Sequence, residues 1–152
     1  MTPRTLQLLR DTAIFEQLSN AQLERIEQRL IILQFEPGDL VFREGAPGRY
    51  ICFIIGGEFD VLKESGEGDS VPIATLSTGH SVGEMSIIDG LTCSATVVSR
   101  TSARVLALTR EDFDLLVDEE PRLGTEIFRG ISRLLSMSLR KTSADLAAAR
   151  SR

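Results

Sequence analysis

The 152-residue sequence predicts a mainly β protein, an eight-stranded antiparallel β-roll of the jelly-roll type with helices at both ends of the chain. The first supporting observation is a series of short apolar runs between residues 31 and 108, separated by glycines that leave no room for crossover helices. The second is helical periodicity in residues 5–30 and again in residues 110–148. Because this length supports one hydrophobic core, we expect a single domain over residues 1–152.

The N-terminal block is expected to be helical, through "LQLLRDTAIFEQL" and then "SNAQLERIEQRL". In the second segment Ser19 and Gln22 have the spacing of a capping box, and Leu18 can pack on Leu23 as a hydrophobic staple. The apolar face of this helix consists of Leu23, Ile26 and Leu30.

Eight strands are expected after residue 30, and their close spacing requires antiparallel pairing. The predicted strands are residues 31–36, 40–44, 50–55, 58–63, 71–76, 80–82, 94–99 and 103–108. The polar segment "KESGEGDSVP" contains two glycines and predicts an exposed hairpin loop.

Two helices are expected to close the chain. Thr109 and Asp112 can cap the first, which ends before Pro121, and Pro121 suits the first turn of the second. The acidic run 118–120 is expected to form helix-start caps or solvated surface. The second helix carries an apolar stripe of Leu123, Ile127, Ile131 and Leu134, with Phe128, Leu135 and Leu139 beside it. Its inner half should pack on the roll, its outer half should project or meet a partner helix, and its end "AAARSR" should fray.

Composition excludes several classes of protein. The formal charge of -5 does not favour a nucleic acid or an anionic membrane as partner. The longest apolar run, residues 50–55, is far shorter than the roughly 20 residues that a membrane span requires. The N-terminus lacks the features of a secretory signal, so we expect a cytoplasmic protein in which Cys52 and Cys93 are reduced thiols. The single histidine, His80, is expected on a strand surface, and we expect no catalytic residue, no metal and no cofactor.

The stretch "HSVGEMSIIDGLTCSATVVS" carries the functional signal. A Gly-Glu pair at the end of a strand, followed by a short helical run, places free backbone N–H groups around a small space that suits an anion. The sequence therefore predicts a local anion site beside Gly83 and Glu84.

Three segments, in this order, resemble the cyclic nucleotide-binding domain family of catabolite activator proteins, protein kinase regulatory subunits and cyclic-nucleotide-gated channels. They are "IFEQLSNAQLERIEQRL", "FEPGDLVFREGAPGRYICFIIGGEFDVL" and "VGEMSIIDGLTCSATV", and the likeness covers about residues 10–140. The last segment lies where the family has its phosphate-binding cassette. The resemblance implies a ligand pocket lined by Gly83, Glu84, Met85, Ser86, Cys93, Ser94 and Ala95.

In this resemblance Glu84 accepts a hydrogen bond from the ribose hydroxyl, and Gly83 lets the backbone approach the ligand. Cys93 stands where the family has its phosphate-binding arginine. A hydrogen bond to an ionised group contributes about 1.5–3 kcal/mol, so cAMP or cGMP should bind more weakly. Arg100 and Arg104 follow in the chain and are expected mainly as solvated surface.

These features predict a non-enzymatic, stand-alone regulatory domain that binds cAMP or cGMP and relays binding through its C-terminal helix to a partner protein or a homodimer. No helix-turn-helix segment follows the long helix, so DNA binding of its own and membrane insertion are not expected. Two alternatives stay open. In the first, the pocket is vestigial and the chain is a dimerisation or docking module. In the second, the ligand is a cyclic dinucleotide held by arginines outside the cassette.

Overall fold

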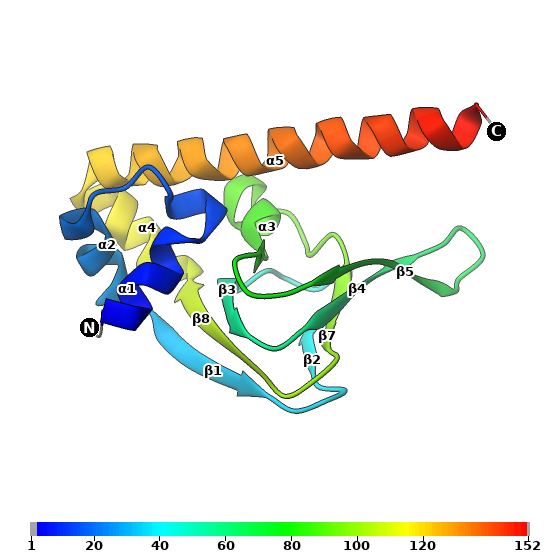
Figure 1. Cartoon of the computed structure of the whole chain (residues 1–152), viewed down its shortest axis with the longest axis horizontal. Coiled ribbons are helices and arrows are strands. Elements are labelled where there is room, and N and C mark those ends of the chain that lie inside the picture. Colours follow the sequence, from blue (N-terminus) through cyan, green and yellow to red (C-terminus); the bar gives the residue numbers. More distant parts are fainter. Residues whose placement is uncertain (1–2, 152) are drawn as a thin grey trace.

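Two four-stranded antiparallel sheets form the roll in the computed structural model, which describes residues 3–151 (Figure 1). The strand orders are β1-β8-β3-β6, here called sheet A, and β2-β7-β4-β5, here called sheet B. The strands are β1 Ile31–Phe35, β2 Leu40–Phe42, β3 Tyr50–Gly56, β4 Phe59–Glu64, β5 Ser70–Leu76, β6 Ser81–Val82, β7 Thr96–Ser99 and β8 Ala103–Thr109. The predicted antiparallel roll with eight strands is confirmed.

Strand ends differ from the prediction at two places that matter for the site. His80 lies in a turn before β6, where its ring Nδ1 is 3.1 Å from the Ser77 backbone nitrogen, and not on a strand. Ser94 and Ala95 precede β7 instead of opening it. The His80 carbonyl still accepts the Ile54 N–H of β3 at 3.0 Å, so the turn lies directly beside the strand.

The N-terminal helices are α1 Pro3–Arg10, a 3-10 turn η1 Ala13–Phe15, and α2 Asn20–Glu27. The helical segment expected through "LQLLRDTAIFEQL" is interrupted at Thr12, which is extended and whose hydroxyl donates back to the Leu8 carbonyl at 3.1 Å. The predicted capping box is present: the Gln22 N–H donates to Ser19 Oγ at 3.2 Å, and the Ser19 N–H donates to Gln22 Oε1 at 3.0 Å.

Three further helices follow: α3 Glu84–Asp89 between β6 and β7, α4 Arg110–Glu119, and α5 Pro121–Arg150. Thr109 caps α4 by accepting the Asp112 N–H at 3.1 Å. The expected fraying of the alanine-rich end is wrong, since α5 continues through Arg150 and projects beyond the body of the roll (Figure 1). No helix within residues 3–151 has the length and hydrophobicity needed to cross a bilayer.

The acidic run 118–120 does not cap the start of a helix with its side chains. Glu119, at the end of α4, pairs with Arg29 at 2.5 Å, and Glu120, which joins α4 to α5, pairs with Arg25 at 2.7 Å. These ion pairs connect the α4–α5 junction to α2 and its C-terminal end.

Sheet A separates two apolar clusters. Along β3, side chains alternate in direction, so that Ile51 and Phe53 join the helices while Cys52 and Ile54 point into the roll. The helical core, on the first side, includes Phe15, Phe53, Phe113, Leu116 and Ile127. The roll core, on the second side, includes Phe42, Cys52, Phe59, Val97 and Val105.

Candidate ligand-binding site

The turn that starts α3 requires a glycine. Gly83 has a left-handed backbone (φ 93°), and a Cβ there would lie 2.5 Å from the Tyr50 carbonyl oxygen and 2.9 Å from the Phe42 ring. The glycine thus makes room for the chain's own backbone and an aromatic ring. This packing is a structural reason for Gly83 that the sequence did not show.

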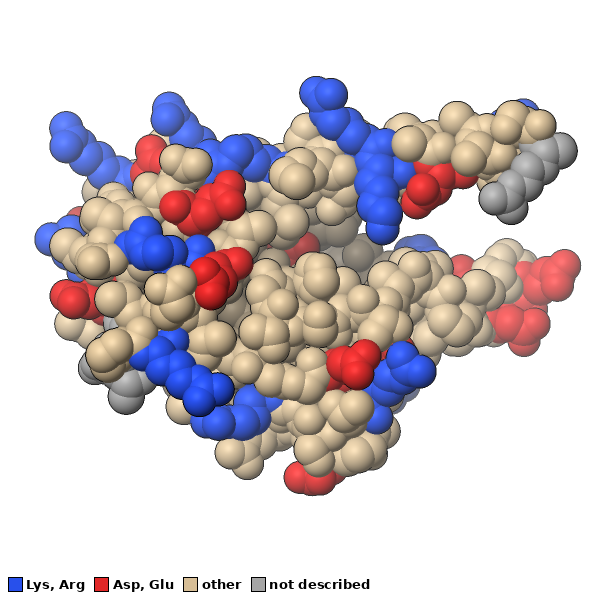
Figure 2. All heavy atoms as spheres, in the orientation of Figure 1, with Lys and Arg blue, Asp and Glu red and all other residues tan. Residues whose placement is uncertain are grey.

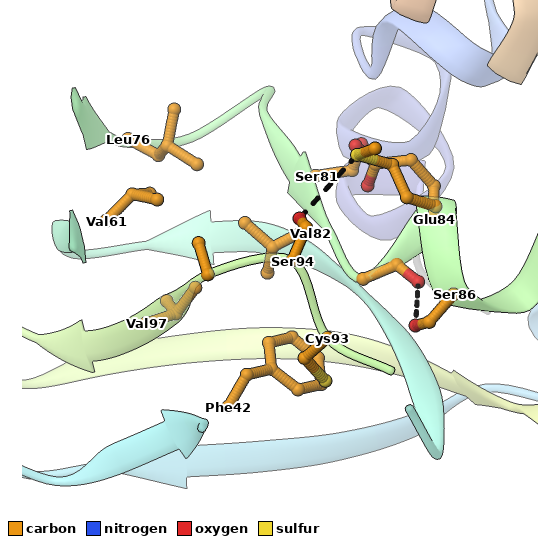
Figure 3. Close-up of a pocket in the computed structure, with 13 residues that line it drawn as sticks. Phe42, Val61, Leu76, Ser81, Val82, Glu84, Ser86, Cys93, Ser94 and Val97 are labelled. Atoms are coloured by element: carbon orange, nitrogen blue, oxygen red, sulfur yellow. Dashed lines mark hydrogen bonds between the residues drawn. The ribbon is translucent and has the colours of Figure 1, made fainter. Parts of the chain in front are cut away.

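Below this turn lies a cavity of about 170 Å³ between α3, the segment before β7 and the inner face of sheet B (Figure 3). The structure brings all seven sequence-predicted residues, Gly83, Glu84, Met85, Ser86, Cys93, Ser94 and Ala95, to its wall. Sequence reasoning missed the other six lining residues, Phe42, Val61, Leu76, Ser81, Val82 and Val97. Most of these are apolar, so the cavity offers a hydrophobic wall opposite a few polar groups.

Glu84 is the acidic group of the cavity. Burial raises the pKa of its carboxyl above the ordinary value, because desolvation penalises the charged form, and its own N–H and the nearby Ser81 hydroxyl offset only part of this effect. Its Oε2 is covered from solvent and has no hydrogen-bond partner of good geometry, and the same holds for Ser81 Oγ. The site therefore contains an unused buried acceptor that a ligand hydroxyl would satisfy.

The two serines differ in their availability. Ser86 is buried, and its hydroxyl donates to the Gly83 carbonyl at 3.3 Å. It also packs closely on Gly48, because a Cβ added to Gly48 would lie 2.0 Å from Ser86 Oγ. Ser94 is exposed, and its hydroxyl makes only a weak contact with Met85 Sδ at 3.7 Å. Ser86 therefore holds the turn together, whereas Ser94 is free to donate to a ligand.

Cys93 is held in place by its backbone. Its N–H donates to the Ala46 carbonyl at 2.8 Å, and its carbonyl accepts the Gly45 N–H at 2.9 Å. The side chain is 8% exposed and belongs to the roll core. Because burial raises the pKa of the Cys93 thiol, the group is neutral at pH 7 and brings no charge of either sign to the cavity.

No lining residue of the cavity is basic. Arg100 and Arg104 are exposed, and neither lines it; Arg104 lines a separate hollow beside Gln34. Lys63, which sequence reasoning did not select, contacts a lining residue from outside the cavity: its Nζ donates to the Ser94 carbonyl at 2.5 Å and pairs with Glu44 at 2.6 Å. The hydrogen bond from Lys63 lowers the pKa of Glu44, so this carboxylate stays charged at neutral pH.

Arg110 connects the cavity wall to the closing helices. Its guanidinium, on the first residue of α4, donates from Nη2 to the carbonyl of Ser86 in α3. Ile87, the next residue of α3, belongs to the helical core. A shift of α3 therefore changes contacts with α4 and with the helices around it.

Within residues 3–151 no group of three or more His, Cys, Asp or Glu side chains could hold a metal ion. The chain thus combines an antiparallel roll closed by helices with a cavity beneath a Gly-Glu turn. The family model of the cyclic nucleotide-binding domain matches residues 32–120, and the chain belongs to that family.

Similar proteins include a cyclic nucleotide-gated potassium channel of Mesorhizobium japonicum, 32% identical over 126 residues, which are 83% of this chain and 33% of the channel. A crystal structure of a cyclic nucleotide-binding domain from Methylobacillus flagellatus superposes with a TM-score of 0.84 at 25% identity, covering 93% of this chain and 80% of that one. A regulatory subunit of a cAMP-independent protein kinase A from Trypanosoma brucei gives a TM-score of 0.75 at 25% identity, covering 85% and 45%. That structure is a variant with three substitutions, one of them to arginine, bound to cAMP. The chain spans about a third of the length of several curated relatives that it matches, the Mesorhizobium channel among them.

Proposed function

We propose that this chain is a regulatory module that binds a cyclic nucleotide, cAMP or cGMP, with reduced affinity and relays binding through its C-terminal helices. The observation that carries the proposal is the single cavity in which all seven cassette residues meet. The gating of the Mesorhizobium channel by cyclic nucleotides supports the same ligand class. The module acts by binding, in the cytoplasm, and not as an enzyme.

In this proposal the free Oε2 of Glu84 accepts a hydrogen bond from the ribose hydroxyl, and the Ser94 hydroxyl donates to a phosphate oxygen. The apolar wall around Val61, Leu76 and Val97 packs on the body of the ligand. The phosphate lacks a dedicated counter-ion, because Cys93 is neutral and Lys63 is already paired with Glu44. Binding is therefore weaker than with an arginine at position 93.

In this proposal, binding at the cavity is relayed to the C-terminal helices through two contacts that α3 makes with the rest of the chain. A ligand that fixes the turn at Gly83 also fixes the Ser86 carbonyl, which accepts from Arg110, and Ile87, which packs in the helical core. A change in either contact is passed to α4 and then to α5, whose outer half is available to a partner or to a second copy.

Calorimetric titration with cAMP and cGMP tests this proposal. The native chain should bind with measurable but low affinity, and Cys93→Arg should bind about ten- to a hundred-fold more tightly, because a charge-assisted bond is added. Cys93→Ser is the matched control, which keeps a small neutral side chain and should bind like the native chain. Failure of both the native chain and Cys93→Arg to show saturable binding at millimolar nucleotide would overturn the proposal.

A second candidate function is a docking or dimerisation module with a vestigial pocket. The absence of a basic residue from the cavity wall favours it, as do Met137, Leu139 and Leu146, which are exposed on the outer half of α5. Binding gained only by Cys93→Arg would support this candidate. A cyclic dinucleotide held by Arg100 and Arg104 is not proposed, because neither side chain lines the cavity.

A further inference from the structure

A second, larger cavity lies on a different part of the chain. This groove, of about 720 Å³, runs between the N-terminal helical segment and the first half of α5, and it shares no residue with the candidate ligand-binding site. Gln17 and Gln22 form part of one side, and Arg122, Glu126, Arg129 and Arg133 of α5 form the other. We refer to it as the arginine groove.

Arg133 is the least satisfied cation of this groove. Its Nε and Nη2 are covered from solvent and have no hydrogen-bond partner in the part of the chain that the structure describes. Burying donors of a charged group without an acceptor is costly, so a partner whose acceptor draws the Arg133 side chain out of this position is favoured.

The other two arginines are also little neutralised. Arg122 forms no ion pair within residues 3–151, and Arg129, whose side chain is exposed, pairs only with the half-buried Glu126, one helical turn away, at 3.6 Å. A surface pair of this kind contributes little. The groove is therefore positive, on a chain whose formal net charge is -5. Figure 2 shows Lys and Arg side chains projecting along the upper edge of the molecule, over α5.

The spacing of the arginines sets the size of the partner. Arg122 and Arg133 are eleven residues apart on one helix, so their backbones are separated by about 16 Å at 1.5 Å per residue. A single small anion does not reach both ends. The partner must carry several negative charges along an extended or helical segment.

We propose that the arginine groove docks an acidic peptide segment of a partner protein, with carboxylates spread along α5. A nucleic-acid strand fits less well, because Glu126 interrupts the positive row and the chain as a whole is acidic. The side-chain amide of Gln17, which is exposed on the opposite wall, is suited to hydrogen-bond a peptide backbone. This proposal is independent of any nucleotide in the other cavity.

Fluorescence anisotropy with a labelled peptide of ten glutamates tests the proposal on the whole chain at low salt. Saturable binding is expected, weakened at least tenfold in Arg133→Met and weakened also in Arg122→Met, an exposed position where folding is not at risk. Arg150→Met is the matched control, since it removes the same charge from the far end of α5 and should leave binding unchanged.

Three results would overturn the proposal. The first is no saturable binding of the peptide. The second is an equal effect of Arg122→Met and Arg150→Met, which would mean non-specific attraction. The third is inorganic tripolyphosphate competing at an affinity equal to that of the peptide, which would assign the groove to a compact anion.

Discussion

Glu84 is a carboxyl group placed where its charge is poorly tolerated. Its Oε2 has no partner, and the surrounding wall is mostly apolar, so desolvation dominates and the pKa is raised. Under the proposed function, the hydroxyl of the ligand would reduce this penalty. The penalty also makes stability depend on pH, because a raised pKa in the folded state means that the fold favours the protonated form.

The substitution Glu84→Gln should reveal this pH dependence. A group whose pKa is raised on folding contributes stability fully below its ordinary value of 4.5, and that contribution is lost as the pH rises through the raised pKa. Relative to Glu84→Gln, the native chain should therefore lose unfolding free energy as the pH rises from the ordinary value of 4.5 through the raised pKa of Glu84. Urea denaturation across this range measures the difference.

The control for this series is Glu67→Gln, at the exposed tip of the β4–β5 hairpin. The difference in unfolding free energy between Glu67→Gln and the native chain should vary much less with pH than the difference between Glu84→Gln and the native chain. A constant difference between the native chain and Glu84→Gln at all pH values would show that the carboxyl of Glu84 is not destabilised by burial.

Among the elements, α5 depends on glycines for its close approach to the N-terminal helices. Gly130 is buried, and a Cβ there would lie 2.1 Å from the Ile14 carbonyl oxygen of η1. Gly124 has a similar but looser contact with Val117 of α4, at 3.1 Å. Glycine in a helix interior costs about 1 kcal/mol relative to alanine. It is needed at these positions because the backbone of α5 lies so close to the neighbouring segment that a Cβ would collide with it.

Gly130→Ala should destabilise the protein by about 1–3 kcal/mol, although alanine is the better helix former, because the added methyl group overpacks the contact with η1. Thermal or urea unfolding measures the change. Ser138→Ala, on the exposed part of the same helix, is the control and should be neutral or slightly stabilising. Stabilisation by Gly130→Ala would mean that α5 does not lie against Ile14.

For the whole molecule, the outer half of α5 contributes little to the fold. Every residue from Ser136 to Ser151 is exposed, and Figure 2 shows this end of the helix standing clear of the β4–β5 hairpin. At a protein concentration low enough to keep the native chain monomeric, removing residues 137–152 should therefore change stability by no more than about 0.5 kcal/mol and the Tm by less than about 2 °C. A larger fall in Tm would show that this half packs on the roll.

Light scattering on the same truncated chain tests the predicted homodimer. The exposed Met137, Leu139 and Leu146 should be the residues that join two copies, so the native chain should have the mass of a dimer and the truncated chain that of a monomer. An equal mass for both would remove the outer half of α5 from the interface.

Local patterns made much of the architecture predictable. The capping box at Ser19, the cap at Thr109 and the Gly-Glu turn at Gly83 each depend on residues within a few positions of one another. The contacts of Lys63 with Ser94 and of Arg110 with Ser86 join residues 31 and 24 positions apart, so only the fold places them. The end of α5 could have been predicted, because Ala147, Ala148 and Ala149 are the best helix formers.

Sheet A separates the cavity from the helices, and α3 spans the division: Ile87 belongs to the helical core, while Cys93, just beyond the helix, belongs to the roll core. Under the proposed function, substitutions inside the roll would therefore change which ligand binds while leaving the surface of the helices unchanged. Substitutions on the helices would change the partner while leaving the cavity unchanged, so the two properties could diverge separately in evolution. The segment from Gly83 to Cys93 contributes to both cores, so selection on either property would act on it.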